Sequence, residues 1–249
     1  MKNLVFVADA HINENPKEVS IFRNFLQKTY PTTGTLCILG DLFDLWVAKK
    51  RLEQDYHSNI IDQLRALKMA GVRLLYIEGN RDFHIRHCYL GDPFDAVSNG
   101  ELAEEFDGRR FYLSHGDMVN TDDKAYLFWR RISKSRFVWR SFNVLPLSAE
   151  AVMAKKIKRM LKETNIKYRS YFPYDKCRAF GERMLNKSFD IVVIGHLHKQ
   201  EIFEFNINGS RRLLYSMPAW KDEKRYLLFE PGKEGRFVDF QNDTGSLFQ

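Results

Sequence analysis

Near its amino terminus the chain reads Leu4-Val5-Phe6-Val7-Ala8-Asp9-Ala10-His11, an apolar run that ends in an aspartate and a histidine. The run lacks polar–apolar alternation, so it predicts a strand covered on both faces, as in a parallel α/β sheet. Four more apolar runs are followed by polar motifs: Leu36–Leu39 by Gly40-Asp41, Val72–Ile77 by Gly79-Asn80-Arg81-Asp82, Phe111–Leu113 by His115-Gly116-Asp117, and Ile191–Ile194 by Gly195-His196-Leu197-His198. Functional groups of open α/β sheets gather beyond the strand ends, so the five motifs predict one site.

The candidate ligands in these motifs offer only oxygen and nitrogen donors. They are Asp9, His11, Asp41, Asn80, His115, His196 and His198. This donor set suits Mn, Fe or Zn, and the lack of cysteine argues against a structural zinc site. Seven ligands exceed one tetrahedral ion but suit two ions about 3.5–4 Å apart that share a carboxylate, an arrangement that stabilises phosphoryl displacement. Asp41 is the expected bridge.

The ordered pattern Asp-x-His, Gly-Asp, Gly-Asn-x-Asp, His-Gly-Asp, Gly-His-x-His resembles the calcineurin-like metallophosphoesterase superfamily, over residues 4–198. Three longer segments are similar to its UDP-2,3-diacylglucosamine hydrolase branch: Gly40–Trp46, Gly79–Phe83, and His115-Gly116-Asp117 with the Asp122-Asp123-x-x-Tyr126 that follows. The resemblance implies hydrolysis of the pyrophosphate bond of UDP-2,3-diacylglucosamine, giving UMP and 2,3-diacylglucosamine 1-phosphate (lipid X) in lipid A synthesis. It also implies two divalent metal ions, with Mn²⁺ the expected metal.

Arg81 departs from the commonest form of the superfamily, in which a histidine follows the Gly-Asn pair. A phosphate that leaves a pyrophosphate is already a stable anion, so it needs charge stabilisation more than a proton. Arginine supplies a permanent charge and a fork that matches phosphate oxygens. Asn80 and Arg81 are therefore predicted as catalytic residues that also hold the substrate, with Asp82 and Asp117 orienting Arg81 or a ligand histidine. The alternative is that Arg81 only pairs with Asp82 or a surface carboxylate.

The length of 249 residues and the hydrophobic content of 44% suit one domain over 1–249. We expect an α/β/β/α sandwich with helices over Pro16–Tyr30 and Leu52–Ala70, the second ending at Gly71. The stretch 121–187 is too long for an ordinary loop and predicts a helical insertion, or lid. Strands are expected at Ile202–Ile207, Arg212–Ser216 and Tyr226–Glu230, all in the second sheet, with a turn at Asn208-Gly209.

The insertion carries 17 lysines and arginines against six acidic residues, whereas the net charge of the whole chain is only +7. Its aromatics alternate with arginines, as in Phe128-Trp129-Arg130 and Phe137-Val138-Trp139-Arg140. An apolar face with a basic rim suits an anionic membrane surface and a diacylated substrate. Two alternatives stay open, namely that the aromatics are core residues or line a single-strand nucleic-acid groove. Acidic residues beside the metals disfavour the groove, so no nucleic-acid partner is expected.

Substrate contacts in the insertion follow from the resemblance alone. Asp123 and Tyr126 match positions that contact the glucosamine and nucleotide in the hydrolase branch, and His196 is expected to touch the substrate as well as a metal. Lys162, Asn165 and Lys167 match its basic helix, which faces the phosphates and uridine. His84 and His87 belong to no motif and are expected at the surface.

The three cysteines, Cys37, Cys88 and Cys177, have neither metal-type nor paired spacing, which suits a reducing cytosol. No run approaches the ~20 apolar residues of a membrane span. A cytoplasmic protein, peripheral on the inner membrane, is therefore expected. The rival functions are a dinuclear-metal phosphodiesterase or phosphatase acting on a nucleotide or nucleic acid, and a non-catalytic metal-binding scaffold. The substrate stays open because Lys49-Lys50-Arg51 stand where the hydrolase branch more often has acidic residues.

Overall fold

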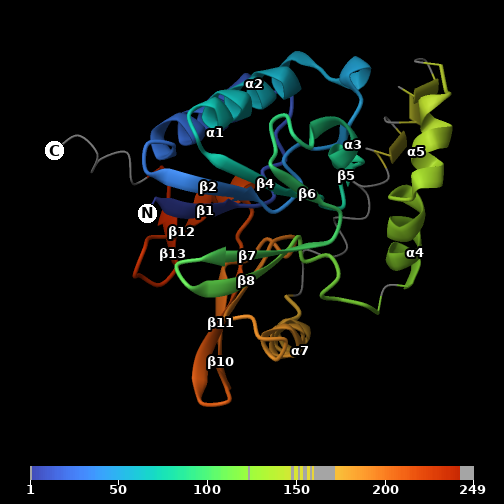
Figure 1. Ribbon diagram of the computed structural model, residues 1–249. Helices are drawn as coiled ribbons and strands as arrows, with labels where there is room; N and C mark the ends of the chain where they lie inside the picture. The colour runs from blue at the N-terminus through green and yellow to red at the C-terminus, as the bar shows by residue number, and fades with distance from the viewer. Residues whose placement is uncertain are drawn as a thin grey trace.

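A computed structural model describes residues 2–122, 124–146, 149–150, 152–153, 156–157, 159 and 172–241. Two β-sheets lie face to face, and helices cover the outer face of each sheet (Figure 1). The predicted α/β/β/α sandwich is therefore confirmed. Among the residues that the structure describes, no helix combines the length and the apolar character that crossing a membrane requires.

The first sheet has six strands in the order β13-β12-β1-β2-β4-β6. Their bounds are β1 Asn3–Val7, β2 Thr33–Ile38, β4 Arg73–Ile77, β6 Ala96–Ser98, β12 Arg225–Phe229 and β13 Arg236–Asp239. The strands β1, β2, β4 and β6 run parallel, and β12 pairs antiparallel with β1. The carboxyl ends of β1, β2 and β4 thus meet at one edge of the sheet.

The second sheet has five strands in the order β10-β11-β9-β8-β7. Their bounds are β7 Glu101–Phe106, β8 Arg109–Ser114, β9 Ile191–Ile194, β10 Glu201–Ile207 and β11 Ser210–Ser216. The strands β8, β9 and β11 are parallel, with the antiparallel strands β7 and β10 at the edges. The predicted turn between β10 and β11 is confirmed, because Asn208 and Gly209 both have positive φ.

The core between the sheets is aromatic at its centre. Phe6 of β1 packs against Phe111 of β8 and Phe229 of β12, with ring centroids 6.1 and 5.9 Å apart. All three rings are fully buried. Apolar side chains on both faces of β1 explain why its sequence shows no alternation, since one face meets the second sheet and the other meets helices.

The expected place of one strand was wrong. The sequence pattern predicts Tyr226–Glu230 in the second sheet, but β12 joins the first sheet, with Leu4 opposite Phe229. The short helix α8 (Trp220–Glu223) precedes β12, and its Trp220 amide donates to the Ala8 carbonyl at 3.0 Å. This bond holds the start of α8 next to the end of β1, so that β12 can pair with β1. A pattern of buried residues predicts a strand but does not specify which of two sheets it joins.

Helices α1 (Pro16–Thr29) and α2 (Asp55–Met69) cover the outer face of the first sheet (Figure 1). The predicted stop of α2 is confirmed at Gly71, which has φ +85° and is followed by a bond from the Val72 amide to the Leu67 carbonyl. Between β2 and α2 lie the two-residue strand β3 (Trp46–Val47) and a turn of 3₁₀ helix (Lys50–Leu52). The strand β3 pairs with β5 (Asp82–Phe83), which α3 (Ile85–Tyr89) follows.

Within the predicted insertion over 121–187, three helices have described bounds. These are α4 (Lys124–Ser133), α5 (Arg136–Asn143) and α7 (Tyr174–Leu185). Helix α7 packs on the second sheet as the fourth layer of the sandwich, through Cys177, Phe180 and Met184. In Figure 1, α4 and α5 stand end to end along one side of the sandwich. The division into one domain with an insertion stays a prediction, but α7 contributes to the sandwich core.

Candidate metal centre

The ligand candidates all lie in loops that leave the carboxyl ends of five strands. Asp9 and His11 follow β1, Asp41 follows β2 and Asn80 follows β4, while His115 follows β8 and His196 and His198 follow β9. Five of them adopt positive φ, between 45° and 67°: Asp9, His11, Asp41, His196 and His198. This conformation is unfavourable for residues with a side chain, and such strain is concentrated at functional sites. The structure brings all seven predicted ligands together.

One half of the cluster consists of Asp9, His11 and His198. His198 Nε2 lies 3.2 Å from Asp9 Oδ1, and His11 Nε2 lies 4.0 Å from the same oxygen. Asp9 is fully buried and accepts the His196 amide on Oδ2 at 2.8 Å. The ligand atoms of these three residues are close enough for one cation to bind all of them.

The other half consists of Asn80, His115 and His196. Asn80 Oδ1 lies 3.1 Å from His115 Nε2 and 3.0 Å from His196 Nδ1. His115 Nδ1 donates to the Leu39 carbonyl at 2.7 Å. This bond leaves the lone pair on Nε2, which faces Asn80 and is available to a metal.

Asp41 lies between the two halves. Its Oδ2 is 4.0 Å from His11 Nε2, and its Oδ1 is 4.0 Å from His115 Nε2. Asp9 is also within reach of both halves, because it groups with Asp41 and His115 as well as with His11 and His198. The bridging role of Asp41 stays a prediction, with Asp9 as the second carboxylate placed to share.

The chemistry of the cluster fits a divalent cation. Neither ring nitrogen of His11, 4 % exposed, has a hydrogen-bond partner among the described residues, and an orphaned buried imidazole is costly unless it binds something else. Burial lowers the pKa of His11 and also, with His115 nearby, lowers that of His196 to about 4. Both rings are therefore neutral near pH 7 and offer lone pairs.

The carboxylates around His115 favour positive charge at that ring. Burial by itself would lower the pKa of His115, but the carboxylates of Asp41, Asp9 and Asp117 raise it above its ordinary value. Burial would likewise raise the pKa of Asp9, yet the surrounding histidines hold it below the usual range. The ionised carboxylate of Asp9, next to the neutral imidazoles of His11 and His196, is suited to a metal cation.

Arg81 is buried at the edge of the cluster. Its side chain lies 3.8 Å from Asp41 Oδ2 and 3.9 Å from Asp44 Oδ1, and its Nη1 donates to the Asp44 carbonyl at 3.1 Å. The alternative of a pair with Asp82 is wrong, because Asp82 Oδ2 instead accepts the amides of Asp41 and Gly79 and the Tyr76 hydroxyl, at 2.7–2.8 Å. Asp82 therefore orients the ligand-bearing backbone rather than the guanidinium.

Asp117 connects the cluster to the insertion. Its Oδ2 accepts the Tyr126 hydroxyl at 2.6 Å and Arg130 Nε at 2.5 Å. Arg130 belongs to no motif and was expected only among the arginines that alternate with aromatics, so its contact with Asp117 was not predicted. The substrate contact of Tyr126 stays a prediction, and here its hydroxyl is directed to Asp117. The remaining predicted contacts, Asp123, Lys162, Asn165 and Lys167, lie outside the described residues.

The basic residues after Trp46 also meet the insertion. Lys49 and Arg51 both pair with Glu150, which is fully buried, and Arg51 Nε lies 2.8 Å from Glu150 Oε2. Lys49 and Arg51, which depart from the hydrolase branch, therefore connect the core to the insertion. The local sequence does not reveal this pairing.

Trp139 of α5 makes a second contact with the core. Its ring stacks on His87 at 5.2 Å with an interplanar angle of 6°, and it also lies 4.9 Å from His84. The surface position expected for His84 was wrong, since this side chain is only 8 % exposed. These ring contacts with the two histidines help to hold the insertion against the core.

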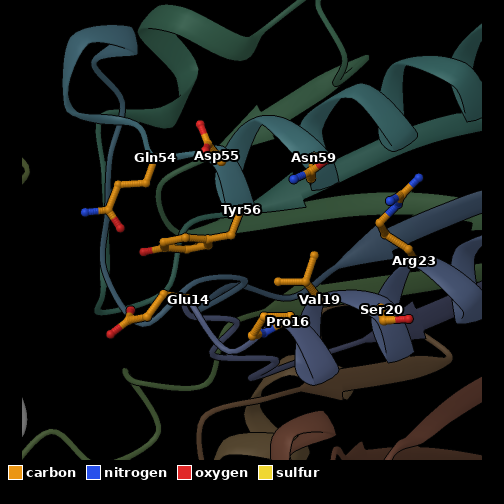
Figure 2. Close-up of a pocket in the computed structure, with 9 residues that line it drawn as sticks. All are labelled: Glu14, Pro16, Val19, Ser20, Arg23, Gln54, Asp55, Tyr56 and Asn59. Atoms are coloured by element: carbon orange, nitrogen blue, oxygen red, sulfur yellow. The ribbon is translucent and has the colours of Figure 1, made fainter.

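A cavity away from this cluster lies between the first turns of α1 and α2, with a volume of about 480 Å³ (Figure 2). Its lining includes Glu14, Val19, Arg23 and Tyr56 but none of the seven ligands. The candidate chemistry therefore lies in the ligand cluster and not in this cavity.

The model of the family described as calcineurin-like phosphoesterase matches residues 2–200. The chain belongs to this family. The chain is also 31% identical to a UDP-2,3-diacylglucosamine hydrolase of Proteus mirabilis (strain HI4320), over 88% of this chain and 91% of that protein. A UDP-2,3-diacylglucosamine hydrolase of Histophilus somni (strain 2336) is 32% identical, over 82% of this chain and 87% of that one.

A solved structure described as a novel archaeal phosphodiesterase aligns with 95% of this chain and 98% of its own, at 10% identity and a TM-score of 0.47. The predicted relationship to the calcineurin-like phosphoesterases and their UDP-2,3-diacylglucosamine hydrolase branch is confirmed by the family match and the two hydrolases. The prediction of a metal-dependent hydrolytic enzyme is confirmed with it. Membership implies divalent metal ions, which the buried donor cluster fits.

Proposed function

We propose that this enzyme hydrolyses the pyrophosphate bond of UDP-2,3-diacylglucosamine to UMP and 2,3-diacylglucosamine 1-phosphate, using two Mn²⁺ ions. The observation that carries the proposal is the cluster of seven oxygen and nitrogen donors beside Arg81, four of them buried and three half-buried, in a chain about as long as hydrolases of that name. Asp9, His11 and His198 would hold one ion and Asn80, His115 and His196 the other, with Asp41 shared. When bound, such ions activate water and neutralise phosphate charge.

The residues of the chain orient the substrate phosphates. Arg81 is pre-positioned, because its amide donates to Asp41 Oδ1 at 2.8 Å and its guanidinium is held by Asp44. A guanidinium fixed in this way stabilises charge on the phosphoryl oxygens and on the departing phosphate without needing to donate a proton. The amide of Asn80 can donate to an equatorial oxygen while its Oδ1 faces the metal side.

Helices α4 and α5 supply a surface suited to the acyl chains and to an anionic membrane. Phe128, Phe137 and Val144 are 68%, 79% and 83% exposed, and Ile132 lies one turn beyond Phe128. Exposed arginines, such as Arg140, lie among them. Apolar side chains with a basic rim suit the interface of anionic lipid. We place the enzyme on the cytoplasmic face of the inner membrane.

The reaction is tested with purified protein, metal-free or reconstituted with Mn²⁺, on UDP-2,3-diacylglucosamine and on the unacylated UDP-sugar. We expect UMP and the lipid 1-phosphate as products, only with metal, and a higher kcat/KM for the diacylated substrate. A preference for the unacylated sugar or for a nucleic-acid phosphodiester would instead favour the rival phosphodiesterase.

The membrane surface is tested by sedimentation with vesicles that contain anionic phospholipid. Replacement of Phe128 and Phe137 by serine should weaken binding by about tenfold or more, since each buried aromatic contributes about 1.5–3 kcal/mol. The control is Met69→Ser, because Met69 on α2 is 89% exposed but lies far from the insertion in sequence. Equal binding of the double variant and the wild type would contradict the membrane placement.

A further inference from the structure

A buried lysine of the insertion holds the backbone next to a metal ligand. Lys134 lies between α4 and α5, and its side chain is 6% exposed. Its Nζ donates to the Gly79 carbonyl at 2.8 Å and to the Glu78 carbonyl at 3.2 Å, and it lies 3.7 Å from Glu78 Oε2. A buried ammonium is costly unless oxygen atoms replace its water, so these contacts hold Lys134 in place.

The Gly79 carbonyl has a direct connection to the cluster. It belongs to the same rigid peptide plane as the Asn80 amide, so a donor that fixes the carbonyl also fixes the start of Asn80. The other side of Gly79 is held by Asp82, which accepts its amide at 2.8 Å. Lys134 and Asp82 together fix the peptides on both sides of Gly79, and this determines where Asn80 Oδ1 lies between His115 and His196.

Helix α4 also contacts the loop that carries His115. Arg130 and Tyr126, on α4, both bind Asp117, and Arg130 Nη2 donates to the Asn99 carbonyl at 2.8 Å. The loop after β8 is therefore contacted by Arg130 of α4, and the loop after β4 by Lys134, the residue that follows α4. These two loops carry His115 and Asn80, whose ligand atoms lie 3.1 Å apart.

We propose that Lys134 is a positioning residue, through which docking of the insertion sets the geometry of Asn80 and Arg81. An insertion displaced from the core would leave the Gly79 carbonyl without this donor and would loosen the second half of the metal cluster. Substrate that seats the insertion would thereby complete the catalytic site. The inference rests on the proposed metal centre but not on the identity of the sugar.

The test compares Lys134→Met and Lys134→Arg with Lys224→Met as the matched control. Lys224 is also 6% exposed, and it binds Glu18 and the Lys221 carbonyl at 2.6 and 2.7 Å, in contacts that include no metal ligand. Titration calorimetry of metal-free protein with Mn²⁺ alone gives the number of ions and their affinities. Steady-state kinetics with UDP-2,3-diacylglucosamine then gives kcat and KM, and thermal melting reports stability.

We expect Lys134→Met to bind the weaker Mn²⁺ about 10- to 100-fold less tightly and to lose kcat by a similar factor, the range seen when a group that orients a metal ligand is removed. The tighter Mn²⁺ and KM should change little, and Lys134→Arg should recover much of the loss. Lys224→Met should lower the melting temperature without either effect.

The inference is overturned if Lys134→Met binds Mn²⁺ and turns over like the wild type, or if Lys224→Met loses the same metal. If Lys134→Met does not fold, Lys134→Arg decides the outcome. A folded Lys134→Arg with the Mn²⁺ affinity and kcat of the wild type supports a requirement for the cation. A loss of affinity and kcat in Lys134→Arg at unchanged stability contradicts it. A wild-type protein that binds only one ion would contradict the dinuclear proposal, while a selective loss of that ion in Lys134→Met would still support positioning.

Discussion

Gly79 is the residue at which the smallest change is expected to have the largest effect on the metal cluster. A Cβ atom at this position would lie 2.2 Å from Asp41 Oδ1, and 2.8 Å from both the Asp41 amide nitrogen and His115 Cε1. Separations below 3.0 Å essentially never occur for a Cβ atom. The substitution Gly79→Ala therefore forces either the Asp41 carboxylate or the loop itself to move.

The size of the effect follows from what Asp41 Oδ1 already contacts. This oxygen accepts the Arg81 amide at 2.8 Å, and a retreat of about 1 Å would break that bond and shift the predicted bridging carboxylate. Overpacking of this kind costs about 1–3 kcal/mol of stability. A displacement of about 1 Å in a catalytic group costs about 100-fold in rate. Gly79→Ala should thus remain folded but lose about 100-fold in kcat and bind less Mn²⁺.

The assay measures bound Mn²⁺ by elemental analysis after gel filtration, kcat with the diacylated substrate, and the melting temperature. Gly100→Ala is the control, since a Cβ atom there meets no atom of the described structure within 4 Å. The control should keep wild-type metal content and rate. If Gly79→Ala retained two equivalents of Mn²⁺ and a near-normal kcat, the close approach of Gly79 to Asp41 would not matter for catalysis and the reasoning would be refuted.

Three other substitutions test separate parts of the site. Asp41→Ala should abolish activity and reduce bound Mn²⁺, because a shared carboxylate offsets the repulsion of two dications. Near-normal turnover of this variant with two ions bound would contradict the dinuclear assignment. Arg81→His should impair pyrophosphate cleavage but relatively improve hydrolysis of a nitrophenyl phosphodiester, where a proton donor assists an alkoxide leaving group. If the rates on both substrates changed equally, the predicted role of Arg81 in stabilising the departing phosphate would be disproved. Glu150→Met should lower the free energy of unfolding by about 1.5–3 kcal/mol in a urea titration, because it removes the buried carboxylate that Lys49 and Arg51 share. Lys49→Met combined with Glu150→Met should recover part of that loss. No recovery in the double variant would show that the pair is not coupled.

The sequence alone was enough to predict the layers of the sandwich and the gathering of seven donor side chains beyond the strand ends. Each ligand stands directly after an apolar run, and parallel strands bring their carboxyl ends to one edge, so local order along the chain implied proximity in space. Asp9 and His196 are far apart in sequence, yet the His196 amide donates to Asp9. The match to the calcineurin-like phosphoesterases covers residues 2–200, a range that includes all five motifs.

Other features of the site depend on contacts between distant segments, which no local pattern specifies. The strand β12 joins the first sheet because the chain returns past Ala8, and the apolar pattern of the strand does not by itself distinguish the two sheets.

The same holds for the contacts of the insertion. Glu150 partners Lys49 and Arg51, and Lys134 binds the carbonyl beside Asn80, although in the sequence each is one of many charged residues in a basic stretch. Whether a charged side chain lies in water or binds a buried backbone oxygen depends on which surfaces meet when the insertion packs on the core. The sequence alone therefore determined the chemistry of the site, and the tertiary structure decided which residues hold that chemistry in place.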